Sequence, residues 1–144
     1  MWQLIFITIV AFKAAISSEV LPILIWHSAA ETCCGDEINS YRDIIKSQFK
    51  SDVYIKSVQI GNTPEEDRIN SLTRHPFKQI ERVCKEILND EKFKNGYNGI
   101  GLSQGGLFMR GLVQLCPHPQ MKNLITLASP HQGVSSYPQC RKYF

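Results

Sequence analysis

The chain has 144 residues, of which 43% are hydrophobic and 20% are charged, and nothing in this composition indicates disorder or repeats. The formal net charge is +3, and no basic run is dense enough, or suitably interleaved with aromatic residues, to indicate nucleic-acid binding. The sequence therefore predicts one soluble globular domain with its own core.

The first 17 residues predict a secretory signal peptide. An apolar stretch at residues 2–12 is followed by Ala15 and Ser17, which are small residues at the positions that signal peptidase prefers. The segment before the stretch lacks Lys or Arg, and Lys13 interrupts its apolar character, so a membrane anchor is the alternative. The stretch is too short to span a bilayer. We expect cleavage near Ser17 or Ser18, an oxidising compartment, and no stable membrane anchor.

Strands and helices are expected to alternate in the rest of the chain. The expected strands are residues 20–26, 52–60, 97–102 and 123–128. The expected helices are residues 38–49, a stretch ending near Leu88 and interrupted near Pro76, and one that ends at Cys116, with a polar connection at 89–95. The apolar run at 20–26 suits a central strand that is buried on both faces.

This order predicts an α/β fold, with a mostly parallel sheet, flanking helices and functional loops at the carboxyl ends of the strands. Three loops then share one edge of the sheet: residues 27–37, the turn at Ser103, and residues 129–133. The side chains that do chemistry are expected there.

The most specific motif is the G-L-S-Q-G pentapeptide at residues 101–105. It follows a predicted strand and precedes four apolar residues at helical spacing: Leu107, Phe108, Leu112 and Leu115. We interpret the first three of these as core rather than lipid groove. A G-x-S-x-G sequence in this context is typical of a nucleophile elbow, in which glycines permit a sharp turn that exposes the serine hydroxyl. Ser103 is therefore the candidate nucleophile.

A serine nucleophile needs a histidine base and an acid, which in α/β-hydrolases follow the serine along the chain. Residues 104–144 contain no Asp or Glu, and their only histidines are His118 and His131. We expect His131 to form hydrogen bonds within its loop, His27 to orient backbone, and His75 to lie on the surface. The chain is thus expected to end before its triad is complete, after about four strands.

Five cysteines are present: Cys33, Cys34, Cys84, Cys116 and Cys140. Cys84 lies on the apolar face of a predicted helix, and Cys116 ends another, so a disulfide between the two helices is sterically reasonable. The other residues of that apolar face are Phe77, Ile80, Ile87 and Leu88. The adjacent Cys33 and Cys34 form either a rare vicinal disulfide or two separate thiols. Cys140 is left unpaired, and no Cys or His spacing suggests a zinc site.

Several segments together resemble the lysosomal palmitoyl-protein thioesterases. They are L-I-W-H at residues 24–27, the pair at residues 33–34, G-L-S-Q-G-G at residues 101–106 and H-Q-G-V at residues 131–134. The resemblance implies an α/β-hydrolase fold, with residues 18–144 as the N-terminal part of one domain. It also implies removal of palmitoyl groups from protein cysteine thioesters, without a cofactor, in the lysosome or after secretion.

The resemblance also assigns individual residues. Ser103 matches the nucleophile, and the backbone N–H groups of Gln104 and Ala29 match the two oxyanion donors. It implies disulfides between Cys33 and Cys34 and between Cys84 and Cys116, with the partner of Cys140 further along. The family usually has H-G-x-G-D where this chain has H-S-A-A-E at residues 27–31. The alternatives are a catalytically incomplete truncated form and a secreted lipase or oxyester esterase.

Overall fold

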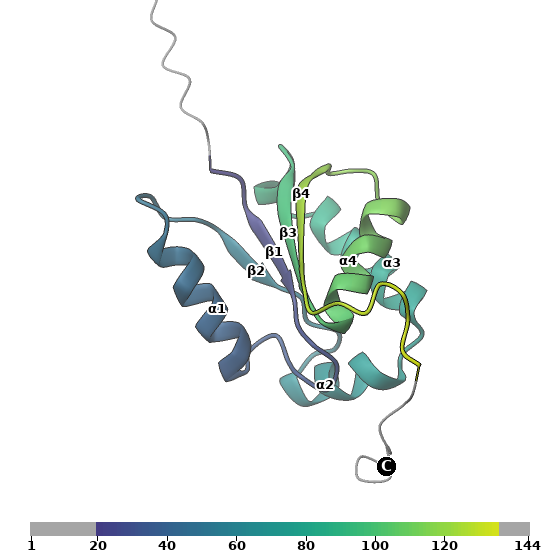
Figure 1. Ribbon diagram of the computed structural model, residues 1–144. Coiled ribbons are helices and arrows are strands. Elements are labelled where there is room, and N and C mark those ends of the chain that lie inside the picture. Colours follow the sequence, from purple (N-terminus) through teal and green to yellow (C-terminus); the bar gives the residue numbers. More distant parts are fainter. Residues whose placement is uncertain (1–19, 136–144) are drawn as a thin grey trace, which may run out of the picture.

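The computed structural model describes residues 20–135. Its sheet has four parallel strands in the order β2-β1-β3-β4, shown in Figure 1: β1 (Ile23–Trp26), β2 (Ile55–Ser57), β3 (Tyr97–Leu102) and β4 (Met121–Leu127). The helices are α1 (Asp36–Ser47), α2 (Pro64–Thr73), α3 (Pro76–Leu88) and α4 (Gln104–Leu115), with a 3-10 turn, η1 (Glu91–Phe93). The predicted parallel α/β architecture is confirmed, and β1 is an inner strand.

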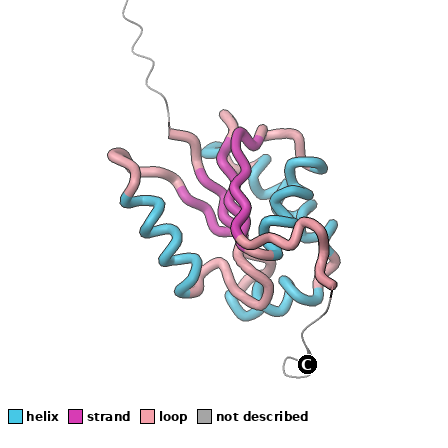
Figure 2. Tube along the Cα trace, in the orientation of Figure 1, coloured by secondary structure: helices cyan, strands magenta, loops and turns pink. Residues whose placement is uncertain are grey.

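Helices cover the two faces of the sheet, as Figures 1 and 2 show. Helix α1 covers one face, where Ile38 packs in a cluster with Ile25 of β1. Helices α3 and α4 cover the other face, where Phe108 of α4 stacks on Trp26 of β1 with ring centroids 4.7 Å apart. All four residues of β1 are buried, because alternate side chains along the strand enter opposite cores.

Local sequence signals explain where the middle helices begin. Thr63 caps α2 by accepting a hydrogen bond from the Glu66 N–H, and Pro64 occupies the first turn. Helix α2 ends before Arg74, and Pro76 starts α3 after an extended His75. The residue before a proline avoids the helical region. The expected interruption near Pro76 is therefore present.

Several expected boundaries differ from the structure. Strands β1 and β2 are shorter than residues 20–26 and 52–60 because their flanking residues lie outside the sheet ladder. The connection at 89–95 contains η1, capped by the Asp90 side chain, and its Phe93 is fully buried against Tyr97. Three apolar residues assigned to helix faces are exposed instead because they lie outside the buried stripes of α3 and α4: Phe77, Leu88 and Leu115.

Strand β4 is an edge strand, and part of it is exposed. Ile125 is 51% exposed and Leu127 is 40% exposed, although both are in register with residues of β3 that pack toward α1. Among the described residues, no helix is long and apolar enough to cross a membrane. The predicted signal peptide and Cys140 lie outside the described residues.

Candidate active site

Ser103 occupies a strained turn between β3 and α4. Its φ of 50° and ψ of −116° lie outside the regions that residues with a Cβ ordinarily adopt. Such strain persists only where the surrounding structure enforces it, and it concentrates at functional sites. The Ser103 N–H donates to Leu127 O at 2.8 Å, which ties the turn to β4. The half-buried Ser103 hydroxyl makes no hydrogen bond with any described residue.

Glycines beside Ser103 bring α4 close to the sheet. A Cβ on Gly105 would overlap the carbonyl oxygen of Trp26 at the end of β1, and one on Gly106 would overlap Ser129 Oγ. Because only hydrogen fits at these positions, the start of α4 lies directly against β1 and the loop after β4. The strand-turn-helix context that the motif predicts is thus present.

The backbone amides of Gln104 and Ala29 lie in segments that meet at Ser71 of α2. Gln104 is the first residue of α4, where backbone N–H groups have no intrahelical acceptor. Its side chain Nε2 donates to Ser71 O at 3.2 Å, while Ser71 Oγ accepts from the Ala30 N–H at 3.0 Å. The loop after β1 and the start of α4 therefore share one anchor on α2.

The loop after β1 turns tightly at residues 28–31. The Glu31 N–H donates to Ser28 O at 3.2 Å, and Ala30 has a φ of 63°, in the left-handed region. Ala29 is an exposed residue, and its N–H has no acceptor within the part of the chain that the structure describes. An unpaired backbone donor at this edge is available to a ligand.

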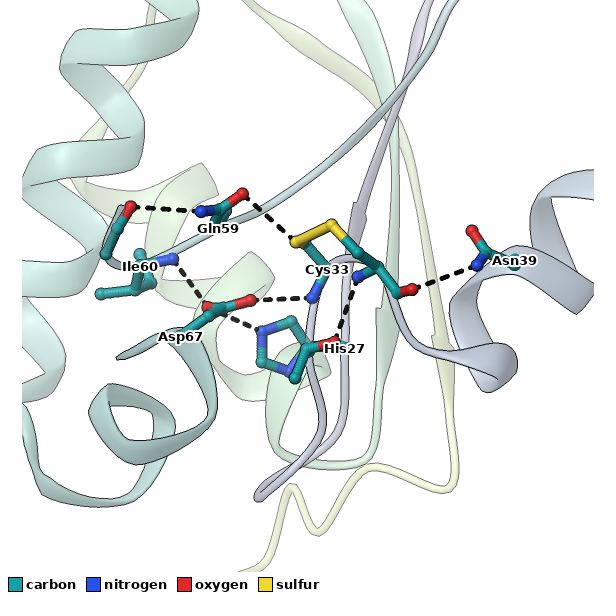
Figure 3. The surroundings of a disulfide bond; sticks show 9 residues. His27, Cys33, Asn39, Gln59, Ile60 and Asp67 are labelled. Carbon is teal, nitrogen blue, oxygen red and sulfur yellow. Dashed lines mark hydrogen bonds and ion pairs between the residues drawn. A yellow bond between two sulfur atoms is a disulfide. The ribbon is translucent and has the colours of Figure 1, made fainter. Parts of the chain in front are cut away.

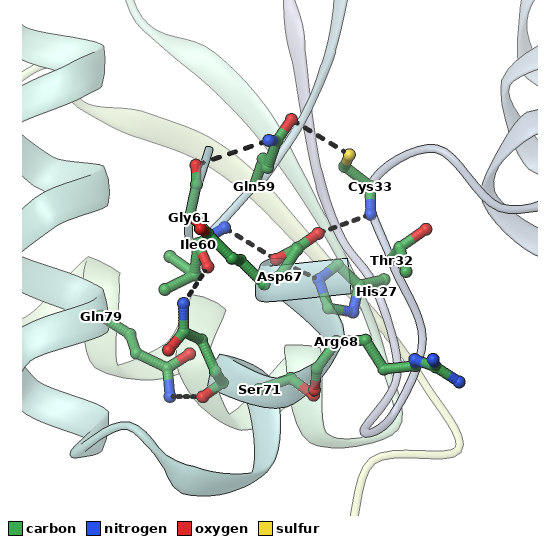
Figure 4. Close-up of polar contacts among 12 residues, drawn as sticks. His27, Thr32, Cys33, Gln59, Ile60, Gly61, Asp67, Arg68, Ser71 and Gln79 are labelled. Carbon is green, nitrogen blue, oxygen red and sulfur yellow. Dashed lines mark hydrogen bonds and ion pairs between the residues drawn. The ribbon is translucent and has the colours of Figure 1, made fainter. Parts of the chain in front are cut away.

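A buried ion pair between His27 and Asp67 holds this loop in place. His27 Nε2 lies 3.2 Å from Asp67 Oδ1, and both side chains are inaccessible to solvent (Figure 3). Asp67 also accepts hydrogen bonds from the backbone N–H groups of Ile60 and Cys33, each at 2.7 Å. Figure 4 shows that Asp67 thereby joins α2 to the loops that follow β1 and β2. Buried carboxylates persist when donors satisfy them in this way.

Electrostatics in this pair favour the charged form of both groups. Burial alone would lower the pKa of His27, but the hydrogen bond to Asp67, the bond to Ser28 O and the negative charges of Asp67 and Glu31 raise it above 6.5. Burial alone would raise the pKa of Asp67, but hydrogen bonds from His27 and from two backbone amides lower it below 3.8. Each group of the pair therefore favours the charged form of the other.

Comparison with known proteins shows the family to which the chain belongs. The family model described as palmitoyl protein thioesterase matches residues 22–144, which include every residue of the site. The chain belongs to this thioesterase family. It is 35% identical over 138 residues to palmitoyl-protein thioesterase 1 of Caenorhabditis elegans, covering 95% of this chain and 45% of that protein.

Two further relatives carry related names. The chain is 35% identical over 124 residues to a Schizosaccharomyces pombe protein named palmitoyl-protein thioesterase-dolichyl pyrophosphate phosphatase fusion 1, covering 86% of this chain and 20% of that protein. It is 30% identical over 132 residues to palmitoyl-protein thioesterase 3 of Dictyostelium discoideum, covering 92% of this chain and 43% of that protein. The chain thus spans less than half the length of these thioesterases.

Three histidines of this chain contact groups other than Ser103: His27, His75 and His131. His131 Nδ1 accepts from Arg110 of α4 at 3.1 Å, which leaves Nε2–H to donate to Thr126 Oγ1 at 3.0 Å. The expectation that His131 forms its hydrogen bonds within its own loop is therefore wrong for the ring, because both ring partners lie outside the loop, in α4 and β4. His75 is exposed and stacks on Phe77. Among the described residues, no histidine contacts the Ser103 hydroxyl.

Both cysteine pairs form disulfides in the structure, which settles the alternative between bridged and separate thiols at residues 33–34. Cys33 is bonded to Cys34, and Cys84 of α3 is bonded to Cys116 at the end of α4. The vicinal pair lies between two helices, because Asp67 accepts from the Cys33 N–H and Asn39 of α1 donates to Cys34 O at 3.1 Å (Figure 3). No group of three His, Cys, Asp or Glu residues that could hold a metal ion occurs within residues 20–135.

Sequence reasoning missed Asp67 and Ser71, which organise the site. Asp67 follows two exposed acids in the first turn of α2, a pattern typical of a solvated helix start. Ser71 resembles any polar helical residue. The only available signal is that residues 27 and 67 each follow a strand at the same edge of the sheet.

One apolar assignment also differs, because Leu107 is half-buried and lines a surface groove beside Gln104 while Phe108 and Leu112 enter the core.

Proposed function

We propose that the protein containing this chain hydrolyses long-chain fatty acyl thioesters, palmitoyl above all, on protein cysteines, with Ser103 as the nucleophile. The observation that carries the proposal is the strained turn at Ser103, which lies at a strand-to-helix junction between closely packed glycines. Family membership and the names of the relatives support the choice of palmitoylated protein as the substrate.

In the proposed mechanism, Ser103 Oγ bonds to the thioester carbonyl carbon and gives its proton to a histidine. The N–H groups of Gln104 and Ala29 stabilise the oxyanion, the C–S bond breaks, and the cysteine thiol leaves with that proton. Water then attacks the acyl-enzyme with the same histidine as base, which releases the fatty acid and restores Ser103. No step requires a cofactor.

The histidine and its orienting acid are proposed to lie outside residues 20–135. His27 and His131 are bound to other partners, and the chain spans 45% of the C. elegans relative. We propose that residues 18–144 form the N-terminal part of one α/β-hydrolase domain. We also propose that residues 1–17 direct the protein to the secretory pathway, and from there to the lysosome or out of the cell.

Hydrolysis of a palmitoyl thioester by the native, full-length protein and by its Ser103→Ala variant tests the proposal. We expect the variant to lose essentially all turnover, since removal of the nucleophile typically costs a factor of about 10⁶ in kcat. Equal activity of the two proteins would refute the assignment. The matching oxyester distinguishes a thioesterase from a secreted lipase or esterase, which would prefer the oxyester.

A catalytically incomplete form is the second candidate, favoured by the absence of a histidine beside Ser103 among the described residues. Expression of the 144-residue chain alone separates the two cases. A folded chain without thioesterase activity, next to an active full-length protein, would assign the missing groups to sequence that follows Phe144.

A further inference from the structure

The protonation of His27 follows from what its two ring nitrogens face. Nδ1 lies 2.8 Å from the carbonyl oxygen of Ser28, and Nε2 lies 3.2 Å from Asp67 Oδ1. A peptide carbonyl can only accept a hydrogen bond, and so can an ionised carboxylate. Each of the two oxygens of Asp67 accepts from a backbone N–H group, Ile60 for one and Cys33 for the other, and these two bonds favour the ionised carboxylate. Both ring nitrogens of His27 must then carry hydrogen, which makes the ring an imidazolium.

The hydrogen bond from His27 fixes the orientation of one peptide unit. Ser28 O and the Ala29 N–H belong to the same planar trans peptide, so they point in opposite directions. Ser28 O is directed at the buried His27 ring and at the Glu31 N–H. The Ala29 N–H is therefore directed away from the buried ring, and Ala29 is exposed.

We propose that His27, held as an imidazolium by Asp67, is the positioning residue that aims the Ala29 N–H into the oxyanion hole. The inference rests on the proposed function, and it adds a role for two side chains that touch neither substrate nor nucleophile. The charged groups that face the ring are Asp67 from α2 and Glu31 from its own loop, and both favour the imidazolium.

The surrounding contacts make this support rigid. Asp67 is anchored by the backbone after β2, and the loop is held again where the Ala30 N–H donates to Ser71 Oγ. The carbonyl oxygen of His27 lies against Gly105, so the same residue also contacts the start of α4. A shift of the loop would therefore move the Ala29 amide relative to Gln104, and misplacement by about 1 Å can cost a factor of about 10² in rate.

Nitrogen NMR of the native protein tests the protonation directly and uses no variant. With ¹⁵N-labelled histidine, both ring nitrogens of His27 are expected to show the shifts of protonated nitrogen from pH 5 to pH 7. A ring with one unprotonated nitrogen in this range would overturn the inference. This result does not depend on whether the protein hydrolyses thioesters.

Kinetics of His27→Gln and Asp67→Asn test the positioning. Because an oxyanion donor acts in the transition state, we expect kcat to fall by a factor of roughly 10² with KM nearly unchanged. Affinity for a palmityl trifluoromethyl ketone, whose hemiketal with Ser103 carries the oxyanion, should fall by the same factor, while affinity for palmitate stays constant. Ile87→Val, a core change in the last turn of α3, controls for general loss of stability.

The outcomes separate the two proposals. A wild-type protein without thioesterase activity, or an active Ser103→Ala variant, contradicts the proposed function. An active wild type whose folded His27→Gln variant keeps both its kcat and its ketone affinity contradicts the positioning role alone. The third outcome is that kcat and ketone affinity fall only in proportion to the unfolded fraction, and that Ile87→Val loses as much at equal stability. This outcome would show that His27 has a structural role only, and it would also overturn the inference.

Discussion

Gly101 at the end of β3 and Gly106 in the first turn of α4 pack backbone against backbone, on either side of Ser103. A Cβ on Gly101 would meet the Gly106 nitrogen at 2.5 Å, closer than any real contact. The turn that exposes Ser103 therefore depends on two residues without side chains. Its geometry is enforced by the packing of the helix on the sheet as well as by the local sequence.

The Gly101→Ala variant is expected to lose about 3 kcal/mol of unfolding free energy, because the new methyl group must push α4 away from β3. Chemical denaturation of the native protein and the variant measures the loss. Gly35→Ala is the matched control, because a Cβ there meets Thr32 Oγ1 at an ordinary 3.4 Å. Gly35 is the N-cap of α1. The Gly35→Ala variant should therefore lose no more than about 1 kcal/mol of unfolding free energy, the usual loss when a favourable helix cap is replaced. Equal losses in the two variants would contradict the packing argument.

Ala30→Gly is expected to stabilise the protein. Ala30 has a φ of 63°, where its Cβ is strained and glycine is not. The relief of this backbone strain is larger than the entropic cost of ordering glycine, which is freer than alanine in the unfolded chain. We therefore expect a net gain of about 0.5 kcal/mol in unfolding free energy. Thermal unfolding of the variant measures this gain. A lower melting temperature than that of the wild type would show that the loop tolerates alanine without strain.

The His27–Asp67 pair predicts how stability depends on pH. The raised pKa of His27 gives a stabilisation that is complete below 6.5 and is lost as the pH rises through the folded-state pKa. The lowered pKa of Asp67 gives a stabilisation that is complete above 3.8 and is lost as the pH falls through the folded-state pKa. The contribution of the pair is therefore largest in mildly acidic solution.

Unfolding free energies of the wild type and of a double variant, His27→Gln with Asp67→Asn, measure this contribution between pH 3 and pH 9. Their difference should rise and then fall with pH. A difference that does not change with pH would mean that neither group changes its pKa on folding, which contradicts the burial of a charged pair.

The disulfide between Cys84 and Cys116 predicts a large effect of its removal. The two residues are 32 positions apart, and the chain-entropy model assigns a bridge across such a loop roughly 3 to 4 kcal/mol. Replacing both cysteines with alanine should lower the unfolding free energy by about that amount, measured by denaturation without reductant. A loss below about 1 kcal/mol would show that packing between α3 and α4 alone fixes the two helices.

The order of elements and the elbow could be predicted from local sequence. A continuous apolar run marks β1, Pro76 marks the break between α2 and α3, and glycines flank Ser103 at the junction of β3 and α4. These signals depend on neighbouring residues, so periodicity and turn chemistry are sufficient to find them.

The contact between His27 and Asp67, which supports the site, could not be predicted from local sequence. His27 and Asp67 are 40 residues apart, and their contact depends on the register of β1 and β2 and on the placement of α2. Asp67 follows acids that are exposed, so its burial has no local signal. The buried stripe of α3 likewise depends on how the helix lies on the sheet, which is why Phe77 is exposed although its spacing suits an apolar face.

Labelling of the native, full-length protein with a fluorophosphonate, followed by mass spectrometry of its peptides, tests the central claim most directly. The probe reacts only with a serine hydroxyl that a nearby base activates. We predict one modified residue, Ser103, and competition of the labelling by palmitoyl thioester. Modification of a different serine, or a folded protein that reacts at none, would contradict the assignment of Ser103 as the nucleophile.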